Sequence, residues 1–314
     1  MNRLIVLGSL NIDLVTTVDR LPRQGETLVG GDLAVFEGGK GANQACAAGR
    51  LGGAVTMIGQ VGPDSFGGKL RITLEAAGVD VSGIGVSSRA TGSACISVLP
   101  NGDNVIIISA GANATLTPDL ALDRLRAAEP YSFLLSQLET PMATVVAAFS
   151  EAKRSGTTTI LDPAPVQPLP AELISNVDFV TPNQIEAAAL LGDGGEGLRT
   201  FDDARSAGVQ LLAAGYRGVV LKMGHLGCYV ATPEVSGAVP GFEVQAVDTT
   251  AAGDTFNAAF AVALAEGQPI LDAAAFANAA GALSVTQRGA QSSIPFRAEV
   301  DSFFMKRSVP KCSL

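Results

Sequence analysis

The sequence contains few charged residues, and it has no run of lysine or arginine. Charged residues make up 16% of the 314 positions, and the formal net charge is −9. So little charge, beside 47% hydrophobic residues, argues against long disordered or coiled-coil segments. The negative balance also argues against nucleic acid or an anionic membrane as the main partner.

Cysteine is scarce as well, and no apolar run reaches the length that spans a membrane. Cys46, Cys95, Cys228 and Cys312 lack the spacing of a metal site or a redox pair, which favours reduced thiols. The opening "RLIVLGSL" is too short and too soon interrupted for a signal peptide. We therefore expect a soluble, cytoplasmic protein with neither a membrane nor a nucleic acid as its partner.

The sequence does have a regular alternation of short β-branched runs with alanine-rich stretches. Runs such as "LIVLGS" and "TTTILDPAP" are typical of buried strands, and stretches such as "NQACAAGRLG" and "QIEAAALLG" are typical of helices. This order predicts an α/β fold with a mainly parallel sheet and helices on both of its faces. The length allows one large domain over 1–314, and no internal repeat divides it.

Ligands of such sheets bind at the carboxyl ends of the strands. We expect the functional loops to be those that directly follow apolar strands: "GSLNID", "SQLETP", "LDPAP", "TPNQIE" and "KMGHLG". Residues 12–38 and 91–109 break the pattern, because they alternate and contain turn residues, with a hairpin expected around Pro100, Asn101 and Gly102. They predict a small antiparallel sheet that either covers the site as a lid or pairs with another subunit.

The stretch "VDTTAAGDTF" at 247–256 places Asp254 after a glycine at the start of an alanine-rich helix. One interpretation is a plain helix cap. The other is a catalytic carboxylate beside an anion site, where the backbone N–H groups of Ala252 and Gly253 bind a phosphate. In that case Asp254 takes a proton from a substrate hydroxyl.

Three further motifs carry polar side chains, and each has two interpretations. In "EGGKGANQA", Gly38, Gly39 and Gly41 are either a turn before a helix or a close approach to a polyhydroxyl ligand, with Lys40 and Asn43 as donors. This loop lacks the Walker A spacing, and no dinucleotide fingerprint is present, which argues against a nicotinamide enzyme. In "SLNID", Asn11 and Asp13 follow the first strand, either as turn residues or as a pair that binds vicinal hydroxyls.

In "TPNQIE", Asn183 is either the N-cap of a helix or, with Glu186 three residues later, a holder of hydrated Mg²⁺ and phosphate oxygens. The single histidine, His225, lies in a loop and is given no proton-transfer role.

Taken together, these stretches resemble the ribokinase branch of the PfkB carbohydrate kinase family over nearly the whole chain. The resemblance rests on "GSLNIDLV", "EGGKGANQA", "SQLETP", "LDPAPV", "TPNQIEA", "KMGHLG", "VDTTAAGDTFNAAF" and "GAQSSIP". It implies the family's three-layer sandwich with a small β lid, and phosphorylation of D-ribose at its 5-hydroxyl by ATP. It also implies a homodimer through that lid, a Mg²⁺ ion with the nucleotide and activation by a monovalent cation, usually K⁺.

The resemblance also implies roles for individual residues. Asp254 would be the general base, and Ala251, Ala252 and Gly253 would frame the anion hole. The sugar pocket would be lined by Asn11, Asp13, Gly39, Lys40, Asn43, Glu139 and Asp254. ATP would be contacted by Asn183, Lys222, Met223, Gly224, His225, Leu226, Gly227, Gly253 and Asn278. Asn183 and Glu186 would organise the Mg²⁺-bound phosphates indirectly. The monovalent cation would lie among Asp248, Thr250, Ser284, Gln287, Gly289 and Ser293, several of them through backbone carbonyls.

Two alternatives to this function stay open. The first is a kinase of the same family that acts on deoxyribose, fructose, 2-keto-3-deoxygluconate or a nucleoside. The second is a sugar-sensing protein that binds without phosphorylating, against which the full set of Asp254, Gly253, Asn183 and Glu186 argues. Lys222 departs from the family pattern, since small polar residues are common at its position, and its contact with the nucleotide is therefore in question.

Overall fold

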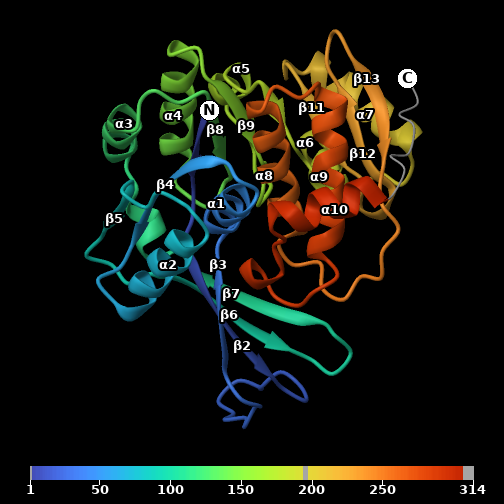
Figure 1. Cartoon of the computed structure of the whole chain (residues 1–314). Coiled ribbons are helices and arrows are strands. Elements are labelled where there is room, and N and C mark those ends of the chain that lie inside the picture. Colours follow the sequence, from blue (N-terminus) through green and yellow to red (C-terminus); the bar gives the residue numbers. More distant parts are fainter. Residues whose placement is uncertain (1, 194–196, 307–314) are drawn as a thin grey trace.

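A central sheet of nine strands organises the computed structural model, which describes residues 2–193 and 197–306 (Figure 1). The strand order is β13–β12–β11–β10–β9–β8–β1–β4–β5. In chain order these are β1 (Arg3–Leu7), β4 (Ala54–Val61), β5 (Ile84–Val86), β8 (Phe133–Ser136), β9 (Thr158–Leu161), β10 (Phe179–Val180), β11 (Val219–Lys222), β12 (Gly227–Ala231) and β13 (Ser236–Pro240).

The pairings from β5 to β11 are parallel, as the sequence predicts, and the β11–β12 and β12–β13 pairings are antiparallel. The antiparallel edge arises because only a few residues separate β11 from β12. So short a connection can join antiparallel strands, but it cannot hold the crossover that a parallel pair needs.

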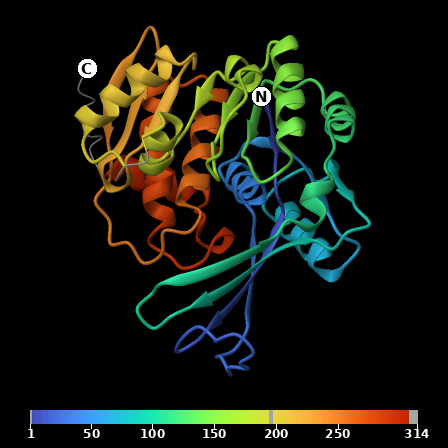
Figure 2. The same cartoon turned by 180° about the vertical axis from the view of Figure 1, so that it is seen from behind.

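Helices cover both faces of the sheet, and strand β1 shows why (Figures 1 and 2). Leu4 and Val6 pack into one apolar core, whereas Ile5 and Leu7 pack into a second core on the opposite face. The first core is completed by α1 (Lys40–Arg50), α2 (Ser65–Ala76), α8 (Ala252–Ala265), α9 (Ile270–Ser284) and α10 (Arg297–Lys306). The second is completed by α3 (Pro118–Ala127), α4 (Met142–Arg154), α5 (Ala171–Ser175), α6 (Gln184–Leu190) and α7 (Phe201–Ala213). The predicted three-layer arrangement is therefore confirmed.

Helices α1 and α8 pack against each other over the middle of the sheet. Both are rich in alanine, whose small side chain lets the helices approach closely. Their buried faces nevertheless include polar side chains, among them Asn43, Gln44 and Asp254. Buried polar groups need partners, so this interface is a place where chemistry is expected.

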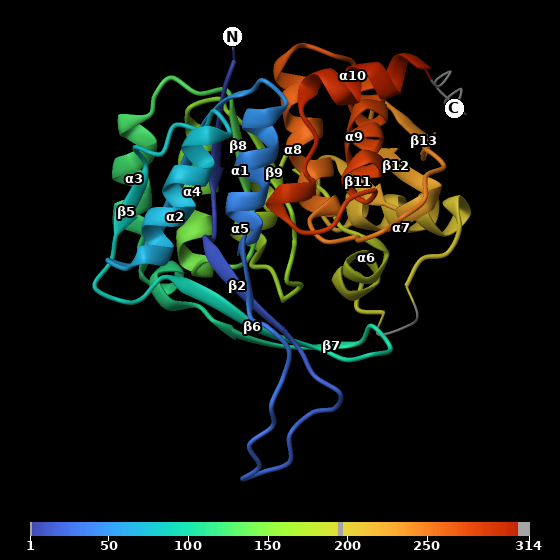
Figure 3. The same ribbon diagram turned by 60° about the horizontal axis from the view of Figure 1, so that its bottom comes forward.

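A second sheet of four strands projects from the main body (Figure 3). Its order is β3–β2–β6–β7, from β2 (Asn11–Thr17), β3 (Ala34–Gly38), β6 (Gly92–Val98) and β7 (Asn104–Ser109). The β6–β7 hairpin is antiparallel and turns at 99–103, as predicted, and β2–β3 is antiparallel too. The central β2–β6 pairing is parallel, because β2 and β6 both enter this sheet from the edge of the main body.

The structure also bears on the expectations about the cysteines and about membrane-spanning segments. Cys46 and Cys95 are free thiols, Cys228 is buried, and Cys312 lies outside the described residues. Within 2–193 and 197–306, no helix has the length and apolar character needed to cross a lipid bilayer.

Candidate functional site

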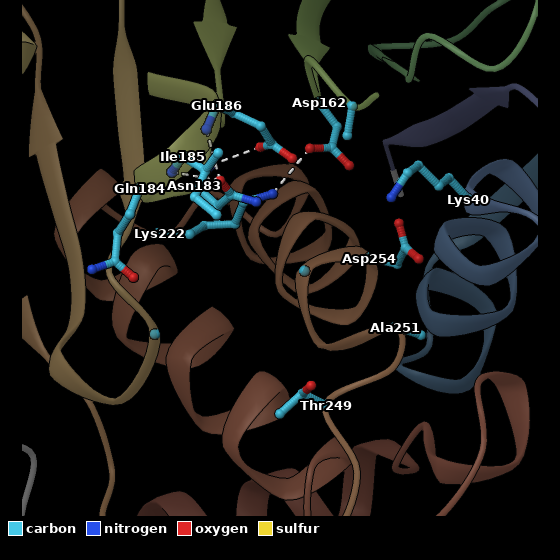
Figure 4. A pocket seen from close by; sticks show the side chains of 13 residues that line it. Lys40, Asp162, Asn183, Gln184, Ile185, Glu186, Lys222, Thr249, Ala251 and Asp254 are labelled. Carbon is cyan, nitrogen blue, oxygen red and sulfur yellow. Dashed lines mark hydrogen bonds and ion pairs between the residues drawn. The ribbon is translucent and has the colours of Figure 1, made fainter. Parts of the chain in front are cut away.

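The five loops that the sequence singles out do follow strand ends, after β1, β8, β9, β10 and β11. These strands are neighbours in the sheet and run parallel, so their carboxyl ends meet at one edge. A cavity of about 410 Å³ opens there (Figure 4). It is lined by Lys40, Asp162, Ala164, Asn183, Gln184, Ile185, Glu186, Lys222, Gly224, Thr249, Ala251, Gly253 and Asp254.

The start of helix α8 forms one wall of this cavity. Its N-cap is Ala251, whose backbone is left-handed at φ 60°, the only such non-glycine residue among those described. This conformation is strained for an L-residue, and strained backbone tends to occur at functional sites. Ala252 N–H makes a long bond of 3.3 Å to Thr249 O, and the helix offers no acceptor to Gly253 N–H.

Asp254 does not cap this helix, so the simple structural interpretation of "VDTTAAGDTF" is wrong. No side chain caps α8. The Asp254 carboxylate instead accepts hydrogen bonds from Asn43 Nδ2 at 2.9 Å and from Gln44 Nε2 at 3.0 Å, both on α1. It is only 6% exposed and still borders the cavity. The two helices thus aim one carboxylate at the floor of the cavity.

Burial controls the charge of this carboxylate. It raises the pKa of Asp254 to about 6, while the nearby Lys40 ammonium acts in the opposite direction. Burial alone would lower the pKa of Lys40, but the carboxylates of Asp254, Asp162 and Glu139 outweigh it and hold that pKa above its usual value. Lys40 therefore stays cationic, and Asp254 is an anion near neutral pH with a proton affinity suited to a base.

The residues expected to bind a sugar lie beside Asp254 but come from three places. Gly39, Lys40 and Asn43 lie at the start of α1, and Glu139 follows β8. Asn11 and Asp13, expected at the end of the first strand, belong instead to β2, because β1 ends at Leu7. Of these six, only Lys40 borders the 410 Å³ cavity; the other five lie outside its lining.

Two features characterise this part of the site: a position that only glycine can occupy, and a pair of neighbouring carboxylates. Gly39 has φ +88°, and a Cβ there would lie 2.7 Å from Asn11 N, so only glycine fits between the β1–β2 loop and α1. Burial, together with the negative charge of Glu139, raises the pKa of Asp13 to about 6. The side where the sequence predicts a sugar therefore holds two carboxylates that repel each other.

Asn183 and Glu186 form a capping box at the start of α6. Asn183 Oδ1 accepts from Glu186 N at 2.9 Å, and Glu186 Oε2 accepts from Asn183 N at 2.7 Å. The capping interpretation is therefore confirmed, and both residues also line the cavity, so capping does not exclude the functional interpretation. Burial raises the pKa of Glu186, opposed by Lys222.

The expected nucleotide residues fall into two groups. Lys222, Gly224, Asn183 and Gly253 line the cavity. The others do not: Met223 and Gly227 are buried, His225 is exposed, Leu226 is half-buried, and Asn278 donates to the carbonyls of Val239 and Pro240.

The residues expected around a monovalent cation gather behind the α8 N-terminus. Asp248 Oδ1 accepts from Thr250 N and Oγ1, and its Oδ2 accepts from Gly289 N at 2.9 Å, so this carboxylate joins two loops. The hydroxyls of Ser284 and Ser293 donate to the carbonyls of Gly281 and Ala290. Gln287 is exposed. The carboxylate of Asp248 and the two serine hydroxyls are oxygen groups, the ligand type that a hard cation prefers.

Three buried polar residues of the site were not singled out from the sequence. Asp162 follows β9, accepts from Gln44 Nε2 at 3.0 Å and pairs with Lys222 Nζ at 3.0 Å. Gln44 Oε1 accepts in turn from Gln137 Nε2 at 2.6 Å. A signal was present, because Gln44 lies within "EGGKGANQA" and the other two lie in loops that follow apolar strands. Asn113 is a further buried member and donates to Asn11 Oδ1 at 2.7 Å.

Comparisons with known proteins agree with this geometry. The model of the pfkB family carbohydrate kinases matches residues 1–297. A ribokinase of Haemophilus influenzae is 41% identical over 303 residues, which cover 96% of this chain and 97% of that protein. The crystal structure of a ribokinase from Thermotoga maritima is similar with a TM-score of 0.88 and 39% identity, covering 98% of this chain and 100% of that one. An Arabidopsis thaliana ribokinase complexed with ribose and ATP has a TM-score of 0.89 and 32% identity, with 98% and 99% covered.

Proposed function

The chain belongs to the pfkB family of carbohydrate kinases, and from this premise we propose that it transfers the terminal phosphoryl group of ATP to the 5-hydroxyl of D-ribose. The products are D-ribose 5-phosphate and ADP. The observation that carries the proposal is the position of the Asp254 carboxylate. It is almost fully buried, two side-chain amides of α1 donate to it, and it borders the cavity next to the α8 N-terminus.

Asp254 is the general base of this reaction. Its carboxylate accepts the proton of the 5-hydroxyl while the sugar oxygen bonds to the γ-phosphorus and the bond from that phosphorus to ADP breaks. Asp254 is an anion at neutral pH, and its raised pKa brings its proton affinity closer to the working pH. Gly253 N–H and the positive end of α8 stabilise the charge on the equatorial phosphoryl oxygens, and Ala251 and Ala252 shape that turn.

The acceptor site has unsatisfied polar atoms that suit hydroxyl groups. Asn43 Oδ1 and Gln137 Oε1 are buried without a hydrogen-bond partner in the described structure. Hydroxyl donors of a sugar would satisfy such acceptors, and Asp13 and Glu139 accept more of them. Asn11 and Gly39 complete the wall, and Lys40 balances the negative charge there.

The residues at the start of α6 fit a phosphate-bound magnesium ion. When bound with ATP, Mg²⁺ neutralises charge on the phosphates and orients them. Magnesium usually takes few protein ligands and keeps several waters, which suits a single carboxylate at Glu186 beside Asn183. The described residues hold no cluster of three metal-binding side chains, in keeping with indirect binding. The adenosine end of the nucleotide would lie toward Gly224, along the stretch 222–227 and Asn278.

A potassium ion fits the oxygen-rich region around Asp248. Its carboxylate joins the loop at 247–251 to the loop at 285–290. A cation bound there would therefore stabilise the conformation of the backbone that forms the anion site. The family resemblance implies Thr250, Ser284, Gln287, Gly289 and Ser293 as its further ligands, several of them through backbone carbonyls.

We further propose that two copies pair through the small sheet. The edge strand β7 exposes a row of aliphatic side chains, of which Ile107 is 67% and Ile108 61% exposed. An uncovered apolar edge strand is a template for strand pairing, and a second copy supplies a matching edge. Light scattering on wild type and an Ile107→Lys variant tests this, with a shift from dimer to monomer expected. The need for ATP and the free thiols of Cys46 and Cys95 support a cytoplasmic location.

A substrate panel tests the proposed function. ATP turnover is measured with D-ribose, 2-deoxyribose, fructose, 2-keto-3-deoxygluconate and adenosine, each with and without potassium. We expect the highest kcat/KM for D-ribose. A higher value for another acceptor reassigns the chain within its family, and ribose-dependent release of ADP excludes a protein that only binds the sugar.

A further inference from the structure

Lys222 and Asp162 form an ion pair inside the wall of the cavity (Figure 4). Lys222 ends β11 and Asp162 follows β9, and Nζ lies 3.0 Å from Oδ1. The two side chains are only 13% and 3% exposed. Such a pair is a poor source of stability, because desolvating both charges offsets most of their attraction. A functional reason for the pair is therefore worth seeking.

The position of the ammonium group supplies that reason. Lys222 Nζ lies 3.4 Å from the point that a Cβ would occupy on Gly253, in the first turn of α8. It thus lies alongside the backbone that we assign to the transferring phosphoryl group. Among the cavity-lining residues Lys222 and Lys40 are the only cations, against the carboxylates of Asp162, Glu186 and Asp254. A polyphosphate entering this cavity needs positive charge at the α8 end, and Lys222 provides it.

Asp162 holds that ammonium in place through a larger network. Its Oδ2 accepts from Gln44 Nε2 at 3.0 Å, and the same Nε2 donates to Asp254 Oδ1 at 3.0 Å. Gln44 is itself fixed by Gln137. Lys222, Asp162, Gln44 and Asp254 therefore form one connected chain, which sets the ammonium and the carboxylate base at fixed places on the two sides of the reacting centre.

We propose that Lys222 is a catalytic residue whose ammonium contacts the migrating phosphoryl group, and that Asp162 is the positioning residue that holds it there. This rests on the proposed kinase function. No proton leaves Lys222 during the transfer; the ammonium stabilises the charge on the phosphoryl oxygens while the new bond to the sugar forms and the bond to ADP breaks. Lys222 then acts on the transition state more than on bound ADP or sugar.

The test compares three variants with wild type, once wild type is shown to turn over ribose. Lys222→Met removes the charge and keeps an apolar stem, Asp162→Asn removes the counter-ion and keeps its shape, and the double variant removes both. Lys153→Met is the matched control, because Lys153 and Asp178 form an ion pair at 2.7 Å with exposures of 22% and 18% and do not line the cavity. For each, kcat, both KM values, the Kd of ADP and the Kd of ADP with aluminium fluoride and ribose are measured.

We expect Lys222→Met to lower kcat by about 10²–10³-fold, the usual effect of losing one transition-state donor. The Kd of ADP and the KM of ribose should change less than about 3-fold, while the aluminium fluoride complex weakens roughly in step with kcat. Asp162→Asn should lower kcat less, and the double variant should match Lys222→Met, since a positioning residue has no effect without the residue it positions.

Other outcomes overturn the proposal. A kcat within about 3-fold of wild type in the Lys222→Met or the double variant removes Lys222 from the transfer. A loss of ADP affinity as large as the loss in kcat makes Lys222 a residue of ground-state nucleotide binding. If Lys222→Met does not fold with Asp162 left buried and unpaired, the double variant, which has no such charge, decides. A wild type without activity on any acceptor refutes the kinase function itself, which is a different failure.

Discussion

Asn43 Nδ2 on helix α1 donates a hydrogen bond of 2.9 Å to Asp254 Oδ2 on helix α8, across 211 positions of sequence. The bond fixes one carboxylate oxygen, and Gln44 fixes the other. The Oδ1 atom of Asn43 has no hydrogen-bond partner in the described structure. It lies on the side where we expect the acceptor sugar. In the proposed reaction, this one side chain would orient the base and offer an acceptor to the substrate.

Replacing the base should abolish most turnover. We expect Asp254→Asn to lower kcat by about 10²–10⁴-fold, the usual contribution of general base catalysis, with ribose and ATP still bound. A coupled assay of ADP release and calorimetric titration measure the two effects. Asp272→Asn is the control, because Asp272 lies in the first turn of the neighbouring helix α9 but is exposed. An unchanged kcat would remove Asp254 from the mechanism.

Activity should fall on the acid side of neutrality. Asp254 must be ionised to accept a proton, and its pKa is raised to about 6 mainly by burial. Asp13 has a pKa of about 6 as well, from burial and from Glu139. We therefore expect kcat/KM for ribose to decline as the pH falls through about 6, more steeply than a single protonation allows. A profile that stays flat to pH 4.5 would contradict both assignments.

The same pKa shifts have the opposite consequence for stability. The folded pKa of Asp13 lies above its ordinary value of 3.8, so the fold favours the protonated form. Its contribution to the free energy of unfolding is fully present below about pH 4 and is lost as the pH rises through about 6. Asp13→Asn removes this loss, so the variant should gain stability relative to wild type as the pH rises from about 4 through about 6, and should keep that gain at higher pH. Urea unfolding of the unliganded protein measures this.

Asp19→Asn is the matched control for that experiment, since Asp19 is an exposed carboxylate that follows the same strand. If the difference between Asp13→Asn and wild type is the same at every pH, burial does not govern the titration of Asp13.

Potassium should activate the enzyme through Asp248. Because this carboxylate joins the two loops behind the anion site, a cation bound among the neighbouring carbonyls would hold Ala251 and Gly253 in place. We expect kcat/KM to fall when Na⁺ or a bulky organic cation replaces K⁺, and Asp248→Ala to lose that response. Steady-state rates at constant ionic strength measure it, and equal rates in all three salts would argue against the site.

Gly41 should tolerate no side chain. A Cβ there would lie 2.6 Å from Gly8 C and from Ser9 N, both backbone atoms that cannot move aside. We expect Gly41→Ala to lower the free energy of unfolding by about 1–3 kcal/mol. Gly68→Ala is the control, because Gly68 lies in helix α2 with no atom within 4 Å of its Cβ position. That change should raise the free energy of unfolding by about 0.5–1 kcal/mol. Denaturant unfolding of both variants gives the comparison.

Much of the fold was predictable from the sequence because local pattern decides it. Apolar β-branched runs and alanine-rich stretches alternate, and each strand of the parallel part except the short edge strand β5 was indicated by such a run. The antiparallel edge was missed because pairing direction depends on the length of the connection between β11 and β12. The parallel β2–β6 pairing joins segments far apart in the chain, and local alternation does not report which strands become neighbours.

The site was predictable to the extent that its residues follow strand ends. Asp254, Lys40, Glu186 and Lys222 lie at one cavity, as the motifs and the family resemblance indicate. What the sequence did not show was the network of Gln44, Gln137 and Asp162, because hydrogen-bond partners depend on which faces of α1, β8 and β9 meet. The sequence also could not show that Asp254 does not cap its helix, because this depends on tertiary contacts. The side chains of Asn43 and Gln44, on another helix, donate to its carboxylate.

The separation of Asn43 and Asp254 along the chain also bears on how the protein is made. At synthesis rates of ~5–20 residues per second, the 211 positions between them take about 10–40 s to translate. During that interval the alanine-rich, uncharged face of α1 has no α8 to cover it, so its alanines and the amides of Asn43 and Gln44 stay exposed on the nascent chain. Substitutions on that face should therefore lower the yield of folded protein in cells more than the stability of the finished enzyme, and chaperones that bind unfinished chains should recognise the first third.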